Sequence, residues 1–217
     1  DGNALPVDVH VRAVEAIARV TNVPVSVDSE GGYSDDPAQV ASTIGRLIGA
    51  GAVGINLEDG TGAPELHAAK IEAVKAEAAR RGVDLFVNAR IDTVLRKLVP
   101  AKEAPAETLR RARLYADAGA DGIFVPALTD AAMIGDIAAA IDPLPLNVLV
   151  WPGLPPAEEL RRLGVRRLSA GGWIGRDALA HAWRSAADFL NTGNFSDLLS
   201  RASGDMPDLN DLFGEET

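Results

Sequence analysis

The chain has 217 residues, of which 47% are hydrophobic and 24% charged, a composition typical of a globular domain. The formal net charge of −10 argues against a nucleic-acid backbone as a partner. The absence of cysteine excludes disulfides, thiolate zinc sites and a cysteine acid or nucleophile. No apolar run approaches a membrane span of roughly 20 residues, and no signal-peptide pattern is present. We therefore expect a cytoplasmic protein with no membrane partner.

Short β-branched segments alternate with Ala/Arg/Glu-rich helical segments along the chain. The pattern predicts strands at 23–28, 52–58, 84–90, 121–126, 146–150 and 165–169. It predicts helices at 8–20, 37–50, 64–81, 105–118, 129–141, 156–162 and 173–191. Asp36 and Pro37 fit the N-cap and first position of the second helix.

The fold class follows from this alternation. The strands are continuous apolar runs, typical of strands covered on both faces, and alternating βα units predict a parallel sheet. Even spacing favours a TIM (β/α)₈ barrel over a doubly wound sheet. Only six strands are predicted, and the chain starts at Asp1 with a helix, so we expect the first one or two βα units to be missing.

Two domains are expected on this basis. Residues 1–195 would form the barrel domain, which is N-terminally incomplete. Residues 196–217 would form an acidic C-terminal tail, because 204–217 contain acids but no Lys or Arg. Such a tail is either mobile or docks on a partner.

Charged side chains gather where the strands end. Functional residues of a barrel lie at the carboxyl ends of its strands. Asp28 and Glu30 follow the first strand and, two residues apart, are expected to leave it on the same side. Glu58 ends the second strand, and Asn88 and Arg90 share one face at the end of the third.

Converging carboxylates from Asp28, Glu30 and Glu58 would form an oxygen-lined pocket suited to Mg²⁺ or Mn²⁺. Arg90 offers a planar fork that matches a carboxylate or phosphonate. A divalent ion beside such an arginine is the arrangement that stabilises an enolate. Two plainer interpretations stay open: a strand-end Asp often caps a helix or turn, and Arg90 could form a structural ion pair with Glu58.

Other features carry weaker signals. The turn Ser169–Gly172 lies where barrels commonly bind phosphate, although such turns are commonplace. Trp151 follows a strand and either lines the pocket or packs in the core. The segment 95–105 is a possible lid or an ordinary solvated loop. His10, His67 and His181 have no ligand-like spacing and are expected on the surface.

The segments VDSEGGY, INLEDGTG and VNARIDT, in this order on consecutive strands, resemble the isocitrate lyase/phosphoenolpyruvate mutase superfamily. AGADGIFVPAL and PLNVLVWPGLPPAEELRRLGVRRLSAGG are similar to its short bacterial members, so the resemblance extends to about residue 195. It implies a Mg²⁺-dependent barrel enzyme, a lyase or decarboxylase acting on small 2-oxo or hydroxy acids. Such enzymes cleave or form a C–C or P–C bond through an enolpyruvate-like intermediate.

The resemblance also implies roles for single residues. Asp28 would hold the metal directly or through water, while Glu30 and Glu58 would hold its waters. Arg90 would grip the substrate carboxylate, so Arg90 and Glu58 are the expected catalytic residues.

We expect further substrate contacts from Asn88, Tyr33 and Trp151. The superfamily often forms homodimers or homotetramers by exchanging the last barrel helix, here about 173–191.

Three departures qualify the resemblance. Glu30 stands where the family usually has Asp, although Glu can still bind a metal through water. The Lys-Lys-Cys-Gly-His loop of isocitrate and methylisocitrate lyases is replaced by GTGAPEL, which argues against both activities. The Ser-Gly substrate clamp of the family would lie upstream of Asp1, so the chain as given is expected to be poorly active or inactive. The alternative is a non-catalytic barrel that serves as a binding or assembly module.

Overall fold

The computed structural model describes residues 4–193 and 195–204, the last four without their side chains. The chain divides into two compact units, Asp1–Ser169 and Ala170–Thr217. Every strand among the described residues lies in the first unit, and α7 and α8, the last two helices described, lie in the second. A barrel domain that extends to residue 195 stays a prediction.

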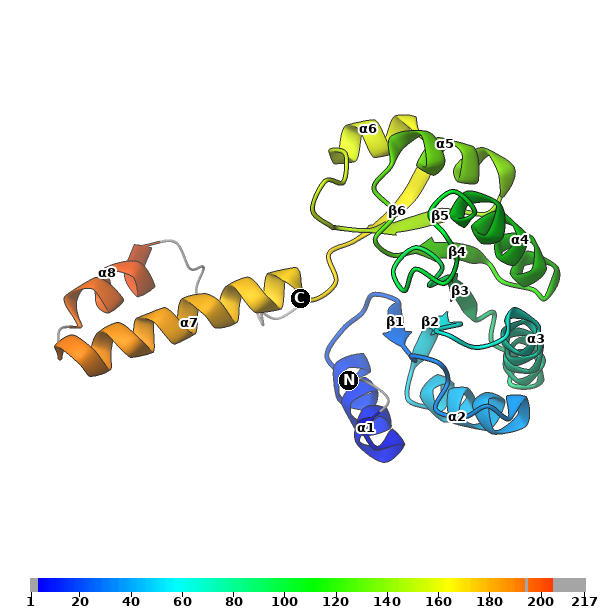
Figure 1. Ribbon diagram of the computed structural model, residues 1–217. Helices are drawn as coiled ribbons and strands as arrows, with labels where there is room; N and C mark the ends of the chain where they lie inside the picture. Colours follow the sequence, from blue (N-terminus) through cyan, green and yellow to red (C-terminus); the bar gives the residue numbers. More distant parts are fainter. Residues whose placement is uncertain (1–3, 194, 205–217) are drawn as a thin grey trace. The chain divides into compact units, whose positions relative to one another are not determined.

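Helices and strands alternate through the first unit (Figure 1). The strands are β1 (Val25–Asp28), β2 (Ala52–Glu58), β3 (Phe86–Arg90), β4 (Gly122–Val125), β5 (Leu146–Leu149) and β6 (Val165–Ser169). The helices are α1 (Val7–Ala18), α2 (Pro37–Gly49), α3 (Pro64–Arg80), α4 (Ala104–Asp117), α5 (Ala131–Ala140), α6 (Ala157–Arg162), α7 (Trp173–Thr192) and α8 (Ser196–Gly204). All six expected strands are therefore present, each within a few residues of its predicted bounds.

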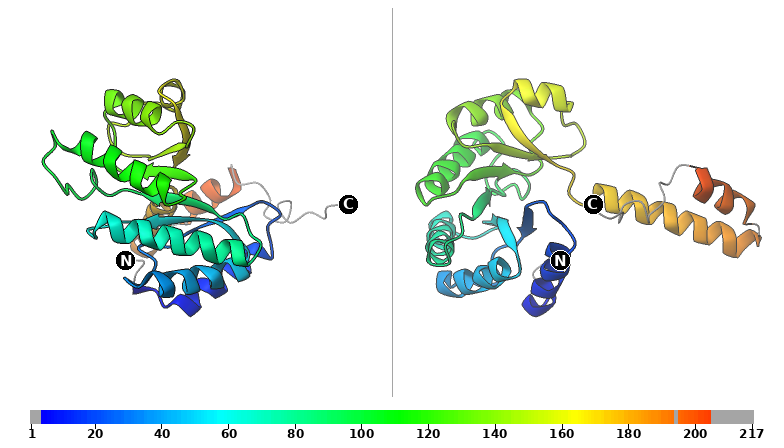
Figure 2. Two further views of the ribbon diagram at one scale, coloured as in Figure 1. Left: turned by 90° about the vertical axis from the view of Figure 1, so that its right-hand side faces the viewer. Right: turned by 180° about the vertical axis from the view of Figure 1, so that it is seen from behind.

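The six strands form one parallel sheet in the order β1-β2-β3-β4-β5-β6. The sheet curls, with helices α2 to α5 arranged along its outer side (Figures 1 and 2). This is a half-barrel, consistent with a partial TIM barrel. The expected loss of one or two leading βα units stays a prediction.

The core lies between the sheet and its outer helices. Ile55 and Leu57 of β2 are fully buried in one hydrophobic cluster with Ile44 of α2 and Ile71 of α3. Successive side chains of a strand point to opposite faces, so the residues that alternate with these face the inner side of the curl. On β2 these inner residues include a glutamate, Glu58. The inner face is thus partly polar, and the expectation of apolar strands covered on both faces holds only for the outer side.

The two predictions about the start of α2 are confirmed. The Asp36 carboxylate accepts a hydrogen bond from the backbone N–H of Ala38 at 2.9 Å, and Pro37 is the first residue of α2. At the other end of this helix Gly51 adopts a φ of +109°, a conformation that glycine reaches without steric cost. The chain can therefore turn at once from α2 into β2.

The structure of the expected tail is known in part. Its first described residues form helix α8, which the sequence pattern does not predict. Residues 205–217 of the expected acidic tail lie outside the described residues.

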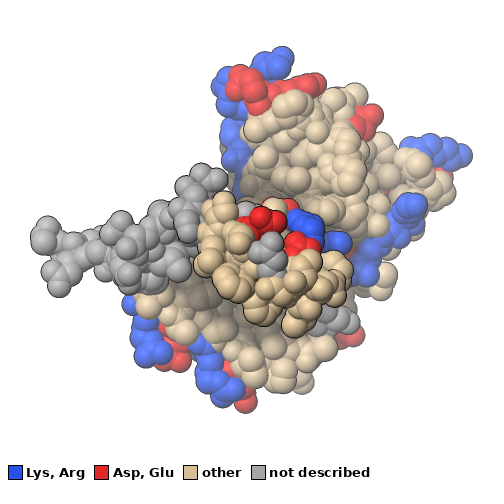
Figure 3. Space-filling view, turned by 90° about the vertical axis from the view of Figure 1, so that its left-hand side faces the viewer, with Lys and Arg blue, Asp and Glu red and all other residues tan. Residues whose placement is uncertain are grey.

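None of the helices described is both long and apolar enough to cross a bilayer. On the face drawn in Figure 3, acidic and basic side chains are interspersed. The described side chains of this face thus form no extended single-sign block of the kind that tracks a phosphate backbone.

The loop between β1 and α2 depends on Gly32. This residue has a φ of +86°, and a Cβ placed on it would lie 2.6 Å from Cγ1 of the buried Val40. We expect Gly32→Ala to lower the free energy of unfolding by about 1–2 kcal/mol for backbone conformation, plus a steric cost of roughly 1–3 kcal/mol. Chemical denaturation measures this loss.

Gly153→Ala is the matched control, because Gly153 has a φ of +88° but no atom within 4 Å of the added Cβ. It should show the conformational cost alone. Equal losses in the two variants would contradict the steric argument.

Candidate active site

Strand register brings polar side chains into two rows across the inner face of the sheet. Glu58 of β2 lies opposite Arg90 of β3, which in turn lies opposite Phe124 of β4. Two residues earlier along the strands, Asn56 pairs with both Asp28 and Asn88. Because all strands run in parallel, the first row marks their shared carboxyl end. The expected gathering of charge at this end is therefore real.

Glu58 and Arg90 form an ion pair, with Oε2 and Nη1 2.5 Å apart. The Arg90 guanidinium also donates to Asp92, from Nε to Oδ1 at 2.8 Å and from Nη2 to Oδ2 at 3.3 Å. Its carbon Cζ lies 5.9 Å from the centre of the Phe124 ring. The structural ion pair that the sequence left as an alternative is thus present, with Asp92 as a second partner.

Arg96 joins the same carboxylates from the loop that follows β3. Its Nε donates to Asp92 Oδ2 at 2.6 Å, and its Nη2 lies 3.4 Å from Glu58 Oε1. Two arginines and two carboxylates therefore form one network. This is the contribution of the 95–105 segment, whose role as a lid stays a prediction.

Asp28 and Glu30 do not leave one strand face together as expected. Strand β1 ends at Asp28, and Glu30 lies in the following turn with a φ of +49°. The Asp28 side chain accepts a hydrogen bond from the Glu30 backbone N–H at 3.3 Å. The Glu30 carbonyl accepts one from the backbone N–H of Glu58 at 2.9 Å. This turn is therefore tied directly to the Glu58 backbone.

The electrostatics of Glu58 reflect this crowding of acids. Burial raises the pKa of Glu58, the Arg90 guanidinium opposes that rise, and the carboxylates of Asp92, Glu30 and Asp28 add to it. A neighbouring negative charge raises the pKa of a carboxyl group only when it is close. The three acids therefore lie near Glu58. An added cation would stabilise such a group of carboxylates.

The donor set can be tested against a divalent ion. Within residues 4–193 and 195–204, no three acidic or histidine side chains are placed to hold one metal ion among them. Mg²⁺, however, keeps several waters and needs only one or two carboxylates. Glu58 Oε2 is buried, and its contact with Arg90 Nη1 is an ion pair without hydrogen-bond geometry. The oxygen donors of Asp28, Glu30 and Glu58 therefore fit a hydrated ion, and do not fit one enclosed by direct ligands.

The Asp59 carboxylate links α4 to the segment after β3, and the sequence pattern predicts no role for it. Its Oδ1 accepts the backbone N–H of Asp92 at 2.9 Å. Its Oδ2 accepts from Arg111 Nη1 and from the Tyr115 hydroxyl, both at 2.7 Å. Burial raises the pKa of Tyr115, so this hydroxyl stays a donor. The available signal was an acid directly after Glu58 and an Arg and Tyr four residues apart on α4.

The three other expected substrate contacts have different surroundings. Asn88 is 1% exposed and donates from Nδ2 to Asn56 Oδ1 at 2.8 Å. The Tyr33 hydroxyl lies 2.9 Å from His10 Nδ1, and Tyr33 lines a cavity of about 540 Å³ together with Glu58. Trp151 follows β5, is 37% exposed and does not line this cavity.

The expectation of a surface position for His67 is wrong. His67 is 2% exposed and packs edge-on against the Tyr115 ring, with ring centres 4.5 Å apart. It lies on the same inward face of α3 as Ile71 and Val74, because residues three and four apart share a helix face.

The Ser169 hydroxyl donates to Asn147 Oδ1 at 3.0 Å. Phosphate binding at this turn stays a prediction.

The family model for phosphoenolpyruvate phosphomutase matches residues 1–190 of the chain. An uncharacterized protein of Mycobacterium tuberculosis is 42% identical over 172 residues, which are 76% of this chain and 62% of that protein. An oxaloacetate decarboxylase of Ectopseudomonas mendocina is 30% identical over 162 residues, or 72% and 55% of the two chains. The chain thus spans about three fifths of the length of these relatives.

A similar fold occurs in a crystal structure from Burkholderia cenocepacia of a protein assigned as a phosphonomutase. The two chains are 39% identical, with a TM-score of 0.79, and the match covers 85% of this chain and 79% of the other.

Glu107 anchors Arg111, which in turn holds Asp59. Hydrogen bonds from Arg110 and Arg111 lower the pKa of Glu107 to about 2. A lowered carboxyl pKa stabilises the fold above the unfolded pKa, and this stability is lost as pH falls toward the folded value. We expect Glu107→Gln to cost about 1–2 kcal/mol at pH 7, after allowance for solvent screening. The cost should vanish between pH 4.5 and 2.

Denaturation of the variant and of the unsubstituted chain across this pH range gives the measurement. Glu65→Gln is the control, since Glu65 is exposed and lies 3.5 Å from Arg110. It should cost less than about 0.5 kcal/mol at every pH. A pH-independent loss in Glu107→Gln would show that the charge is not responsible.

Proposed function

Since the chain belongs to the phosphoenolpyruvate phosphomutase family of the isocitrate lyase/phosphoenolpyruvate mutase superfamily, we propose that it is a Mg²⁺-dependent enzyme of the lyase or decarboxylase type. Its substrate is a small 2-oxo or hydroxy carboxylic acid, such as oxaloacetate, phosphonopyruvate or a 2-methylmalate-like acid. The observation that carries the proposal is the Glu58–Arg90 ion pair beside Asp28 and Glu30 at the carboxyl end of the sheet.

Arg90 binds the substrate carboxylate in this proposal. Its Nε and Nη2 each donate one hydrogen bond to Asp92, and Nη1 is ion-paired with Glu58. A guanidinium has five N–H groups, so donors remain on Nη1 and Nη2 to bind a carboxylate in a bidentate manner. Glu58 and Asp92 thus orient the arginine without occupying all of its donors.

Asp28 would hold Mg²⁺ or Mn²⁺, with Glu30 and Glu58 on the waters of the ion. The ion would supply positive charge next to the oxygens on which negative charge develops. Glu58 contributes a second property, because its raised pKa suits a group that accepts or returns a proton.

The reaction is a heterolytic cleavage whose electron pair enters an enolate. For a 2-oxo acid the bond between C3 and its substituent breaks: a carboxylate substituent leaves as CO₂, and a phosphoryl substituent passes to an oxygen nucleophile, the enolate oxygen or water. For a 2-hydroxy acid the hydroxyl loses its proton and becomes the 2-oxo group, and the electron pair of the broken C2–C3 bond enters the enolate form of the other carboxylate fragment. In a lyase or decarboxylase reaction a proton then adds to the enolate carbon. Asn88, Tyr33 and Trp151 are proposed to contact the rest of the substrate from β3, the β1–α2 loop and the β5–α6 loop.

Isocitrate and methylisocitrate lyase activities are not proposed. The chain has no cysteine, and the β2–α3 connection that would carry a thiol acid is Asp59–Ala63. The product is therefore protonated by another group or by water.

A non-catalytic barrel is the second candidate. Two observations favour it. Arg90 is already paired with two carboxylates. Among the described residues, no three acidic or histidine side chains are arranged to bind one cation directly. A panel of 2-oxo acids, assayed with Mg²⁺, is the first test, and metal-dependent oxalate binding is the readout that needs no turnover. Turnover above that of Mg²⁺ alone supports the enzyme.

We also propose a homodimer or homotetramer that exchanges α7. Within this helix no residue is buried, and one face carries Leu179, Trp183 and Leu190, each more than 70% exposed. Such an apolar helix face is typical of a surface covered in an assembly.

Light scattering after size exclusion tests the assembly. We expect the unsubstituted chain to form a dimer or tetramer and Trp183→Glu to be a monomer. The exposed Asp177→Asn on the same helix should assemble normally. A monomeric unsubstituted chain would contradict the proposal.

Calorimetry with oxalate, which mimics an enolpyruvate, tests the active site directly. We expect oxalate to bind only when Mg²⁺ or Mn²⁺ is present. Asp28→Asn should abolish the metal-dependent oxalate binding, and Arg90→Lys should weaken it about tenfold or more, because Lys lacks the fork.

Asp177→Asn and Arg161→Lys are the matched controls. Both residues are exposed and lie on helices, α7 and α6, rather than at the carboxyl ends of the strands. Oxalate binding that does not depend on a divalent ion would refute the metal site.

A further inference from the structure

A cavity of about 540 Å³ adjoins Glu58 on the side of the β1–α2 loop and α3. Its lining includes Gly31 and Tyr33 of the loop, His67 and Lys70 of α3, and Arg96 of the β3–α4 loop. Neither Asp28 nor Arg90 lines it. The cavity is therefore a neighbour of the proposed metal and carboxylate sites and shares one wall, Glu58, with them.

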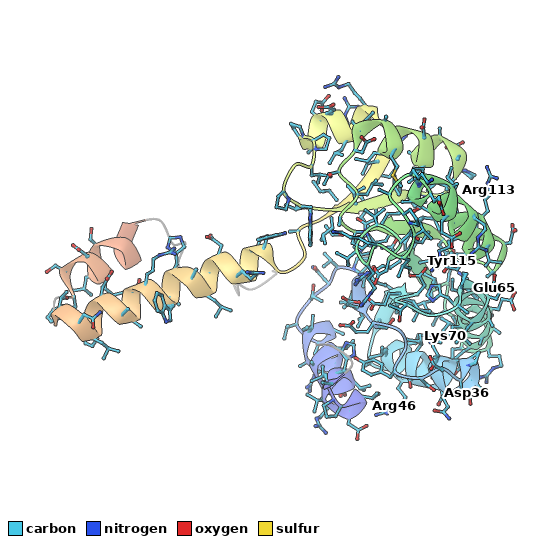
Figure 4. The ribbon with its side chains drawn as sticks, in the orientation of Figure 1. Asp36, Arg46, Glu65, Lys70, Arg113 and Tyr115 are labelled. Atoms are coloured by element: carbon cyan, nitrogen blue, oxygen red, sulfur yellow. The ribbon has the colours of Figure 1, made fainter. Side chains whose placement is uncertain are left out.

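Lys70 is a buried cation in the wall of this cavity. Its side chain is 9% exposed and comes from α3, next to α4, which carries Tyr115 (Figure 4). Its Nζ donates to the Gly31 carbonyl at 3.0 Å and lies 3.4 Å from Asp35 Oδ1. The Asp35 side chain is 94% exposed, so water screens this contact strongly. A buried ammonium with so weak a counterion is costly unless an anion joins it.

His67 lies one helical turn before Lys70, on the same face of α3. It is 2% exposed, and neither of its ring nitrogens has a hydrogen-bond partner. Burial lowers the pKa of His67 to about 3, and the charges of Lys70 and Arg111 act in the same direction. The imidazole is therefore neutral and has one N–H to donate. An unpaired buried polar group is unfavourable, so a ligand atom that accepts this N–H is the simplest partner.

The acids of the wall already have their own cations. Asp59 is paired with Arg111, and Glu58 lies against Arg90 and Arg96. Asp35 is the exposed residue described above. The positive charge of Lys70 is thus the one least compensated in the lining, and it stands beside an N–H donor.

We infer that this cavity is the subsite for a second acidic group of the substrate, a carboxylate or a phosphonate. Lys70 Nζ binds the group as its counterion, and His67 donates a hydrogen bond to it. That this ligand is the substrate rests on the proposed function. Glu58 and Arg96 line the cavity and also belong to the proposed active site, so one molecule could contact both. The enzyme accordingly prefers 2-oxo acids with a second acidic group over monoacids such as pyruvate.

The first experiment asks whether the cavity binds an anion. The chain, carrying ¹³C-labelled histidine, is titrated with inorganic phosphate and followed by NMR, and His67→Gln identifies the signal among the three histidines. We expect phosphate to shift the His67 signal in a saturable manner. Lys70→Met should weaken phosphate binding about tenfold, and Lys70→Arg, which keeps the charge, should retain most of it.

Lys75→Met is the matched control. Lys75 lies on the same helix but pairs with Asp121 at 2.9 Å, away from the cavity lining, and the substitution removes the same charge. Phosphate binding should stay within about twofold of the unsubstituted chain. An unmoved His67 signal, or equal effects of Lys70→Met and Lys75→Met, would overturn the subsite.

The second experiment asks whether the anion is part of the substrate. Oxaloacetate should displace phosphate from His67, whereas pyruvate should not. If oxaloacetate leaves phosphate in place, the assignment to substrate is overturned. Failure of the proposed function is read separately, from Mg²⁺-dependent oxalate binding and its loss in Arg90→Lys. Each of the two inferences can therefore fail without the other.

Discussion

The buried Asp59 carboxylate is the interaction on which the carboxyl end of the sheet depends. Its side chain is fully buried, so the charge depends on three donors from the protein, two on α4 and one in the loop after β3. The donor in the loop is the backbone N–H of Asp92. Helix α4 is thereby fixed against the ends of β2 and β3. Asp92, once positioned, orients both arginines of the network.

The neighbouring turn obeys a similar constraint. Glu30 reaches the site in a left-handed conformation, held by a backbone hydrogen bond from Glu58. Backbone hydrogen bonds and buried polar contacts thus hold most of the site in place. They also position its more exposed carboxylates, Asp28 and Glu30. This division of roles is typical of sites whose ligand-facing groups must be rigid.

The order of strands and the clustering of charge could be predicted because both follow from short-range patterns. Alternating periodicities locate the elements, and parallel strands bring their carboxyl ends to one edge. The pairing of Glu58 with Arg90 could therefore be predicted. The direction of the Glu30 side chain could not, because strand alternation gives no information about a residue after the strand has ended.

Partners far apart in sequence account for the rest. Asp59 is 52 residues from Arg111 and 56 from Tyr115, and no local pattern links them. The same applies to Lys70, whose partner carbonyl on Gly31 lies 39 residues away. Burial of His67 depends on how α3 is rotated against α4, which a single histidine in a helical segment does not reveal. Such pairings require the three-dimensional structure.

The environment of Arg90 has a consequence for the entropy of ligand binding. A free arginine side chain loses about 2 kcal/mol of rotamer entropy when a ligand immobilises it. Here two carboxylates and the Phe124 ring already restrict the guanidinium, so most of that loss occurs during folding. A small acid makes few contacts and can offset little ordering of the protein. Because Arg90 is already ordered, a small acid can bind it without offsetting that entropy loss.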